Sequence, residues 1–237
     1  MTEHMTTRLS LPLVQQAQSQ KHVTVNESLA RLDGLVNLVL VSLSRKNPPG
    51  SAIDGACFAV PAGAGGDWAG QDGQIAIASN NGWIFAAPQA GMRAFVADQG
   101  MQAIYDGDAW VPGALSLGGF GSALCARTAE AEVSLSPGTE IVTDLTIPAA
   151  SLVIGATARV AEEIRGSMAS WRMGTAGAAD RFGSGLGVQA QSWARGMLSQ
   201  PFTYWEPAPV ILSATGGSFI SGKVRIAAHW LELTVPR

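Results

Sequence analysis

The sequence predicts a mainly β protein with one short N-terminal helix, a small antiparallel β module and a larger, jelly-roll-like β-sandwich. Three observations support this fold class. Near the N-terminus, apolar residues recur at alternating steps of four and three, the spacing of a coiled-coil seam. Short alternating segments bounded by turn residues fill most of the remaining chain. Glycine is abundant, with 28 of 237 residues, and only 14% of residues are charged, which suits closely packed strands.

Residues 1–23 are polar and rich in glutamine, and Pro12 prevents a continuous helix from starting early. We expect these residues to form an attachment arm that docks on a neighbouring protein. A partly frayed terminus is the alternative. The first ten residues contain Glu3 and no apolar stretch, so a signal peptide is not expected.

Residues 24–46 are predicted to form a helix. Thr24 and Glu27 fit a capping box at its start, and two prolines and a glycine at residues 48–50 stop it. Additional leucines widen its apolar surface, which favours a trimeric coiled coil; a single amphipathic helix packed on its own β domain is the alternative. The expected trimerisation residues are Val25, Leu29, Leu32, Val36, Val39 and Leu43.

Residues 47–112 are predicted to form the small antiparallel β module. The Asn-Asn-Gly of residues 80–82 lies between two apolar runs, which is a strong signal for a β-hairpin. A weaker copy of this strand, turn and tryptophan arrangement surrounds residues 106–108. The module's core is expected to contain Trp68, Trp83 and Trp110.

Residues 113–129 are rich in glycine and serine and are predicted to link two domains. From residue 130 to residue 237 the chain is again strand-like, with turn signals roughly every 8–12 residues. Many short strands at this spacing indicate a β-sandwich, for which a jelly roll is one arrangement.

Composition and charge argue against several classes of function. The net charge is −3 and no stripe of lysine and arginine is present, so nucleic-acid binding has no electrostatic basis. No apolar run reaches the roughly 18–20 residues that span a bilayer, so membrane insertion is not expected. Cys57 and Cys125 show neither metal-ligand spacing nor a disulfide framework, and we expect free, buried thiols and no cofactor or metal.

Catalytic patterns are weak in this sequence. Two of the three histidines lie in the arm, and the third, His229, lies within a predicted strand, where a packed or surface histidine is expected rather than a general base. Glu162 and Glu163 are neighbours on a strand and point to opposite faces, so they cannot act as a carboxylate pair. Glu130 and Glu132 share a face, and we interpret them as surface charge. The protein is therefore not expected to be an enzyme.

Aromatic residues beside hydrogen-bonding side chains indicate where sugars could bind. An exposed ring covers the apolar C–H face of a sugar, and neighbouring polar groups satisfy its hydroxyls. Core or subunit-interface packing is the alternative for these aromatic residues. The glycan-binding candidates are Trp171, Arg172, Asp180, Arg181, Tyr204 and Trp205.

Longer motifs carry a resemblance. Residues 20–33, with the sequence QKHVTVNESLARLD, resemble the opening of a phage-related family of alphaproteobacterial prophages and gene transfer agents, with an N-terminal domain of unknown function. The likeness covers about residues 15–112. Further matching motifs lie at residues 48–49, 68–73, 82–83, 105–107 and 110. Three motifs in the second half are similar to the distal domain of tail-fibre or spike proteins, at residues 170–174, 180–183 and 216–219.

The resemblance implies a homotrimeric tail fibre or spike of a phage or gene-transfer-agent particle. Its N-terminal arm would attach to other virion proteins, and its distal part would bind host cell-surface polysaccharide. It would be made in the bacterial cytoplasm, released by lysis and located on the particle surface. A purely structural connector or decoration protein is the main alternative, and a polysaccharide-degrading spike is another. The resemblance carries no catalytic residues to this chain.

Overall fold

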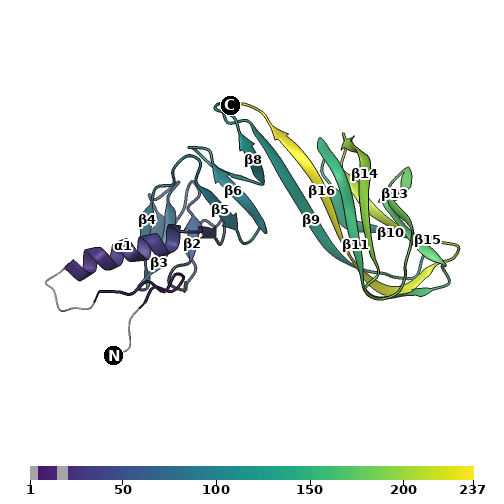
Figure 1. Cartoon of the computed structure of the whole chain (residues 1–237), viewed down its shortest axis with the longest axis horizontal. Helices are drawn as coiled ribbons and strands as arrows, with labels where there is room; N and C mark the ends of the chain where they lie inside the picture. Colours follow the sequence, from purple (N-terminus) through teal and green to yellow (C-terminus); the bar gives the residue numbers. More distant parts are fainter. Residues whose placement is uncertain (1–4, 15–20) are drawn as a thin grey trace. The chain divides into compact units, whose positions relative to one another are not determined.

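The computed structural model describes residues 5–14 and 21–237. These residues contain one α-helix, the short 3₁₀ helix Gly66–Trp68 and three β-sheets, which confirms the prediction of a mainly β protein with a short N-terminal helix. The chain divides into two compact units, Met1–Ala123 and Leu124–Arg237 (Figure 1). Within the described residues, no helix is long and apolar enough to cross a membrane.

The first unit is built on a mixed sheet of seven strands, not on the purely antiparallel module that we expected. The strand β1 pairs in parallel with both of its neighbours, β2 and β5, and the remaining pairs are antiparallel. In sheet order the strands are β4 (Gly82–Ala86), β3 (Ile75–Ser79), β2 (Cys57–Ala59), β1 (Val39–Leu40), β5 (Arg93–Val96), β6 (Met101–Tyr105) and β7 (Trp110–Pro112).

The predicted hairpin at residues 80–82 is confirmed. Asn80 and Asn81 connect β3 to β4 with φ angles of 50° and 59°, the left-handed pair that a two-residue hairpin turn requires. Ser79 pairs with Gly82 across this turn. The weaker copy is also a hairpin, between β6 and β7, where the Asp106 carboxylate accepts hydrogen bonds from the backbone N–H groups of the next turn residues.

The helix α1 (Lys21–Leu35) starts and ends earlier than residues 24–46. Asn37 follows it with a φ of 48°, a left-handed conformation that is common just after a helix end. Three of the expected trimerisation residues therefore lie beyond the helix: Val36, Val39 and Leu43. The seam is not continuous on one helix, and the structure shows no coiled coil.

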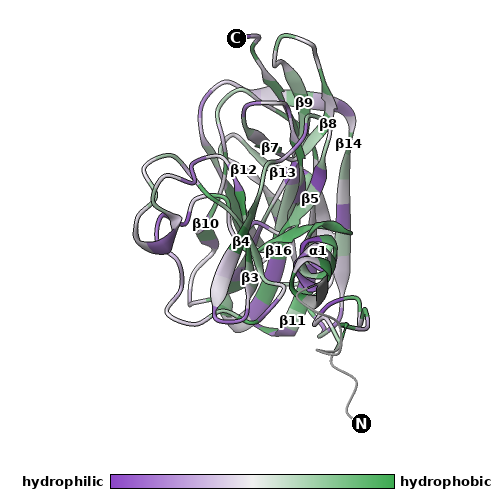
Figure 2. Cartoon of the chain, turned by 90° about the vertical axis from the view of Figure 1, so that its left-hand side faces the viewer, coloured by the Kyte–Doolittle hydropathy of each residue, from purple (hydrophilic) through white to green (hydrophobic). Residues whose placement is uncertain are grey.

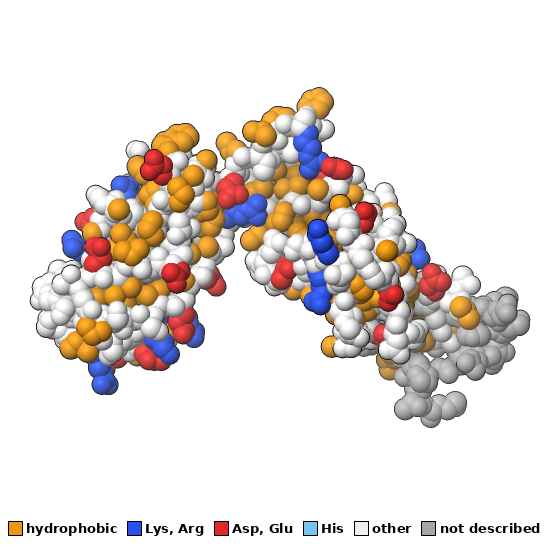
Figure 3. All heavy atoms as spheres, turned by 180° about the vertical axis from the view of Figure 1, so that it is seen from behind, with side chains coloured by type: hydrophobic (Ala, Val, Ile, Leu, Met, Phe, Trp, Pro, Cys, Tyr) orange, Lys and Arg blue, Asp and Glu red, His pale blue; other side chains and the backbone are white. Residues whose placement is uncertain are grey.

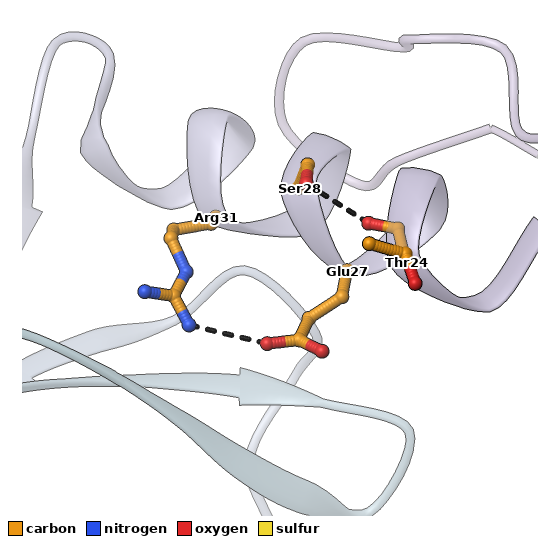
Figure 4. Close-up of polar contacts among 4 residues, drawn as sticks. All are labelled: Thr24, Glu27, Ser28 and Arg31. Atoms are coloured by element: carbon orange, nitrogen blue, oxygen red, sulfur yellow. Dashed lines mark hydrogen bonds and ion pairs between the residues drawn. The ribbon is translucent and has the colours of Figure 1, made fainter. Parts of the chain in front are cut away.

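The expected capping box lies inside α1 and not at its start. The Glu27 carboxylate forms an ion pair with Arg31 at 3.1 Å, and the Ser28 hydroxyl donates to the Thr24 carbonyl at 2.9 Å (Figure 4). Both contacts join residues four apart, on successive turns of a helix that is already formed. The capping prediction is wrong because α1 begins at Lys21.

The described part of the arm folds back onto this helix. Asp33 is 2% exposed, and its carboxylate accepts a hydrogen bond from the Thr6 hydroxyl at 2.7 Å. The same carboxylate accepts from the backbone N–H groups of Arg8 at 3.0 Å and Leu9 at 2.6 Å. Three donors from the arm therefore satisfy a charge that would be costly to bury alone.

The side chain of Arg8 adds further hydrogen bonds between the arm and the C-terminal end of α1. Its guanidinium donates to the carbonyls of Asp33, Gly34 and Asn37 at 2.9, 2.7 and 2.8 Å. The last carbonyls of a helix lack partners within the helix, and a cation at that end is favourable. The arm thus caps α1 of its own chain. Residues 1–4 and 15–20 of the expected attachment arm lie outside the described residues.

Both faces of the central strands of this sheet are covered (Figure 2). On one face α1 approaches so closely that a Cβ atom at Gly34 would lie 2.8 Å from the Ile77 side chain. On the other face, Trp68 packs against Phe58 and Trp83 with ring centroids 5.2 and 5.1 Å away. Trp68 is fully buried, as expected, and Trp83 and Trp110 are half-buried.

The expected linker, residues 113–129, contains regular structure. It includes strand β8 (Ala114–Leu117) and the start of β9 (Ala123–Ser134). The turn between them is closed by a hydrogen bond from the Gly118 N–H to the Ser122 carbonyl at 2.7 Å.

The second unit contains two antiparallel sheets with one core between them. One sheet has the order β10 (Glu140–Ile147), β15 (Ala208–Thr215), β12 (Ser170–Thr175) and β13 (Ala178–Leu186). The other has the order β14 (Trp193–Tyr204), β11 (Ser151–Gly166), β16 (Phe219–Thr234), β9 and β8, of which β8 precedes the second unit in the chain. The largest fully buried side chains of this core include Trp171, Phe182, Phe219, Ile147, Met173 and Leu212.

We predict that Asp33→Ala destabilises the first unit by about 3 kcal/mol, because it leaves buried donors without an acceptor. Glu27→Ala is the matched control, since it removes an exposed carboxylate from the same helix and should cost under about 0.5 kcal/mol. Denaturant unfolding followed by circular dichroism measures both changes. Equal effects of the two substitutions would contradict the role assigned to Asp33.

A second prediction concerns Cys57, whose thiol lies 3.5 Å from the Gly34 carbonyl that Arg8 also contacts. Burial raises the pKa of its thiol to about 11, an effect that Arg8 opposes and Asp33 reinforces. Since the thiolate is the reactive form, a maleimide at pH 8 should leave Cys57 unmodified in the folded protein and label it after unfolding. Mass spectrometry of the labelled peptides gives the readout. Labelling of Cys57 at the same rate in both states would contradict this burial.

Candidate ligand-binding site

The six glycan-binding candidates do not come together in one site. Trp171 is 2% exposed in the core of the second unit, and its indole N–H donates to the Gly187 carbonyl at 2.9 Å. Tyr204 is 9% exposed, and its hydroxyl lies 3.1 Å from that of Thr175. Neither ring offers a face to a sugar, because strand alternation turns both side chains into the core.

The other four candidates are dispersed. Trp205 is 81% exposed just after β14, and Asp180 is exposed on β13. Arg181 is half-buried and places its guanidinium 4.2 Å from the centroid of the Phe202 ring, while Arg172 is half-buried on β12. Arg172 and Arg181 lie on paired strands, but within residues 5–14 and 21–237 no hydrogen bond or ion pair joins any two of these four side chains.

A different surface of the second unit has the shape of a ligand site. It is a hollow of about 720 Å³ on the outer face of β9, β16, β11 and β14, which we call the sheet groove. Its lining residues are Glu130, Ala131, Glu132, Thr157, Ala158, Arg159, Trp193, Ala194, Arg195, Arg225, Ile226 and Ala227.

Strand register places the larger side chains of the sheet groove in a row across the sheet. Trp193 on β14 pairs with Arg159 on β11, and Arg159 pairs with Arg225 on β16. Directly paired residues of antiparallel strands project from the same face. Arg225 in turn reaches Glu132 on β9, with its Nε 2.8 Å from the carboxylate. Trp193 is 66% exposed at the outer end of this row.

A second row contains smaller residues. Arg195 on β14 pairs with Thr157 on β11, and Thr157 pairs with Ala227 on β16. Thr157 and Ala227 are short, whereas Arg159 and Arg225 project from the same two strands in the first row. Trp193 and Arg195 form the β14 wall of the groove, and Glu130 and Glu132 form its β9 wall.

Charge is divided unevenly between these walls. The hydrogen bond from Arg225 lowers the pKa of Glu132, so this carboxylate is ionised and held in place. Arg159 donates to the Gln191 side-chain oxygen at 3.1 Å, and the Arg195 guanidinium lies 5.8 Å from the centroid of the Trp193 ring. The groove thus combines an exposed ring, fixed cations and a fixed anion.

His229 lies on β16 beside the groove. Its Nδ1 is 3.1 Å from the Thr128 hydroxyl, and its Nε2 is 3.3 Å from the Thr157 hydroxyl. Both ring nitrogens are engaged, as expected for a packed strand histidine. Across residues 5–14 and 21–237, no group of three or more His, Cys, Asp or Glu side chains is placed to hold a metal ion.

The sequence did contain a signal for this site. Trp193 and Arg195 are two apart on one strand, so they share a face. Glu130 and Glu132, which we interpreted as surface charge, share a face of β9 in the same way. Local spacing does not reveal that β9 and β14 lie in one sheet with β11 and β16 between them.

We predict stability effects of very different size for two tryptophans of the second unit. Trp171→Phe should cost about 2 kcal/mol or more, because it leaves a void and removes a buried hydrogen-bond donor. Trp193→Phe should change the free energy of unfolding by less than about 0.5 kcal/mol, because the side chain is largely exposed. Denaturant unfolding of both variants measures the difference, and a larger cost for Trp193→Phe would contradict the placement.

Comparison with protein-family models identifies a known family in the first unit. Residues 25–111 match the model of a family described as a protein of unknown function, DUF2793. A search of curated proteins gives no match. Among solved structures, the chain is similar to one titled "Cyanophage Pam1 capsid asymmetric unit", with 21% identity and a TM-score of 0.34, covering 45% of this chain and 84% of that chain. A TM-score this low supports no structural argument.

The family match falls inside residues 15–112, where the sequence motifs predicted an N-terminal domain of unknown function, and this part of the resemblance is confirmed. The matched region contains most of α1 and all strands of the seven-stranded sheet except the end of β7. It covers less than half of the chain. The protein therefore carries a DUF2793 domain in its first unit.

Proposed function

We propose that the protein is a structural, non-catalytic appendage of a phage or gene-transfer-agent particle and that its sheet groove binds host cell-surface polysaccharide. The particle context follows from the sequence resemblance. The observation that carries the binding proposal is the exposed ring of Trp193 at the rim of a hollow lined by fixed charged groups. An aromatic face with adjacent hydrogen-bonding groups suits a sugar ring.

Strand order supports a jelly roll for the second unit. Its strands form nested antiparallel pairs, β9 with β16, β10 with β15, β11 with β14 and β12 with β13. Such nesting results when a long hairpin, each arm of which contains four strands, is wrapped so that its strand pairs are shared between two sheets. Jelly rolls occur in viral capsid and lectin domains. Fold alone does not assign a function, so the ligand proposal depends on the groove.

The surroundings of Glu132 do not suit it to act as the general acid of a glycosidase. A glycosidase needs one protonated carboxyl group as general acid, usually with a raised pKa. The pKa of Glu132 is instead lowered by Arg225, and the Arg225 contact occupies one of its oxygens at 2.8 Å. Glu132 is therefore suited to accept hydrogen bonds from sugar hydroxyls.

Several copies would strengthen a weak sugar site, because linked sites raise the effective concentration, and we keep the homotrimer as part of the proposal. Its support is the exposure of four of the expected trimerisation residues, Val25 at 41%, Leu32 at 52%, Val36 at 42% and Val39 at 37%. Light scattering coupled to size-exclusion chromatography should give the mass of three chains for the purified protein. A monomer at all concentrations would remove this part of the proposal.

Binding to purified bacterial capsular and O-chain polysaccharides tests the proposed function. Wild-type protein should bind at least one of them without releasing reducing ends. Trp193→Ala should weaken binding at least tenfold if the ring contributes as much as aromatic side chains do in stacking on nucleobases, on the order of 1–3 kcal/mol. Trp205→Ala is the matched control, since Trp205 is also exposed, at 81%, but lies outside the groove.

Other outcomes would overturn the proposal in different ways. Release of reducing ends would point to a polysaccharide-degrading spike. Binding that is unchanged in Trp193→Ala would place the site elsewhere. Absence of binding to every polysaccharide would favour the purely structural connector or decoration protein.

A further inference from the structure

We propose that the sheet groove selects polysaccharides that carry carboxylate groups, with Arg159 and Arg195 binding the acid while Trp193 stacks on the sugar ring. This inference rests on the proposed function and names the ligand class of the same site. The ligand is identified by its chemistry, as a chain containing uronic or other sugar acids.

The arginines of the groove differ in whether they already have a carboxylate partner. Arg225 is paired with Glu132 at 2.8 Å. Arg159 instead donates to a neutral amide, that of Gln191, and Arg195 lies beside the neutral ring of Trp193. Within the described residues, no carboxylate lies at ion-pair distance from either guanidinium. Two positive charges on the β11 and β14 side therefore lack a counter-ion from the protein.

Arg159 and Arg195 lie on the same face of the sheet as Trp193. Arg159 pairs directly with Trp193 across β11 and β14, and Arg195 lies two residues further along the strand that carries Trp193. Side chains two apart on a strand share a face, so the ring and both guanidinium groups project into one region. Arginine binds carboxylates in a planar, two-pronged arrangement. A sugar stacked on Trp193 would place an acid group on its ring edge within reach of these arginines.

The opposite wall of the groove, formed by β9, is acidic. Glu130 and Glu132 line the β9 side of the groove, where they repel anions and accept hydrogen bonds from hydroxyls. An acidic sugar would therefore be oriented with its carboxylate toward β14 and its hydroxyls toward β9. A neutral sugar would leave Arg159 and Arg195 partly covered without an anionic partner, which costs binding free energy.

A direct comparison of three probes tests the selectivity: polygalacturonate and alginate, which carry carboxylates, and neutral pullulan. Titration calorimetry at low and at moderate salt should give binding of at least one carboxylated probe at least tenfold tighter than pullulan. The double variant Arg159→Gln with Arg195→Gln should lose at least tenfold in affinity for that probe and most of its salt dependence. Arg165→Gln is the matched control, because Arg165 is exposed on the same strand, β11, outside the groove.

The outcomes separate this inference from the proposed function. Pullulan bound as tightly as the carboxylated probes, with loss in Trp193→Ala, would overturn the acid selectivity and leave polysaccharide binding standing. Carboxylated probes bound equally by wild type and the double variant would show attraction by overall charge and overturn the roles of Arg159 and Arg195. No binding of the three probes, together with binding of a neutral capsule, would overturn the inference alone, and no binding of any polysaccharide would overturn both.

Discussion

The antiparallel ladder between β11 and β16 is the constraint on which the second unit depends. These are its longest strands, with 16 residues each, and they lie in the middle of the five-stranded sheet. Because successive side chains alternate between faces, the same register buries Ala158 and Val160 in the core and turns Thr157 and Arg159 into the groove. A slip by one residue would expose the first pair and bury the charge of Arg159. Core packing and groove geometry are therefore fixed together. On the face of the molecule that Figure 3 shows, acidic and basic side chains are scattered among hydrophobic and uncharged ones.

Short-range patterns predicted the fold best where one local interaction decides the conformation. The Asn80-Asn81 turn depends only on left-handed backbone angles that asparagine tolerates, and it forms as expected. The helix prediction failed because the apolar spacing continues past its true end. Beyond Asn37, buried Leu38 and Leu40 alternate with exposed Val39, which is a strand pattern that shares positions with the expected seam. Arg8, which belongs to the N-terminal arm, also stabilises the helix end. This contact joins residues too far apart in the sequence to be predicted from a short segment.

Site residues were harder to predict because the same residue types serve the core and the surface. Trp171 and Trp193 both lie on strands beside arginines or polar residues, and only the parity of each strand relative to the core separates them. That parity depends on which partners a strand acquires. The sheet groove gathers residues from strands up to about a hundred positions apart, as the Arg225 contact with Glu132 illustrates. Candidate residues chosen from local clusters therefore included Trp171 and Tyr204, which form part of the core instead.

The two-residue strand β1 has a consequence for how the first unit assembles. On one side of it lies the meander β2, β3 and β4, and on the other lies β5, β6 and β7. Each meander is made of antiparallel neighbours in sequence and can form from local contacts, whereas Val39 and Leu40 join them through parallel pairing at longer separation. The residues around β1 hydrogen-bond to both meanders, as from the Val41 N–H to the Cys57 carbonyl and from the Ala97 N–H to the Leu40 carbonyl, each at 2.8 Å. The seven-stranded sheet is therefore complete only once this short segment has entered between two meanders that can form separately.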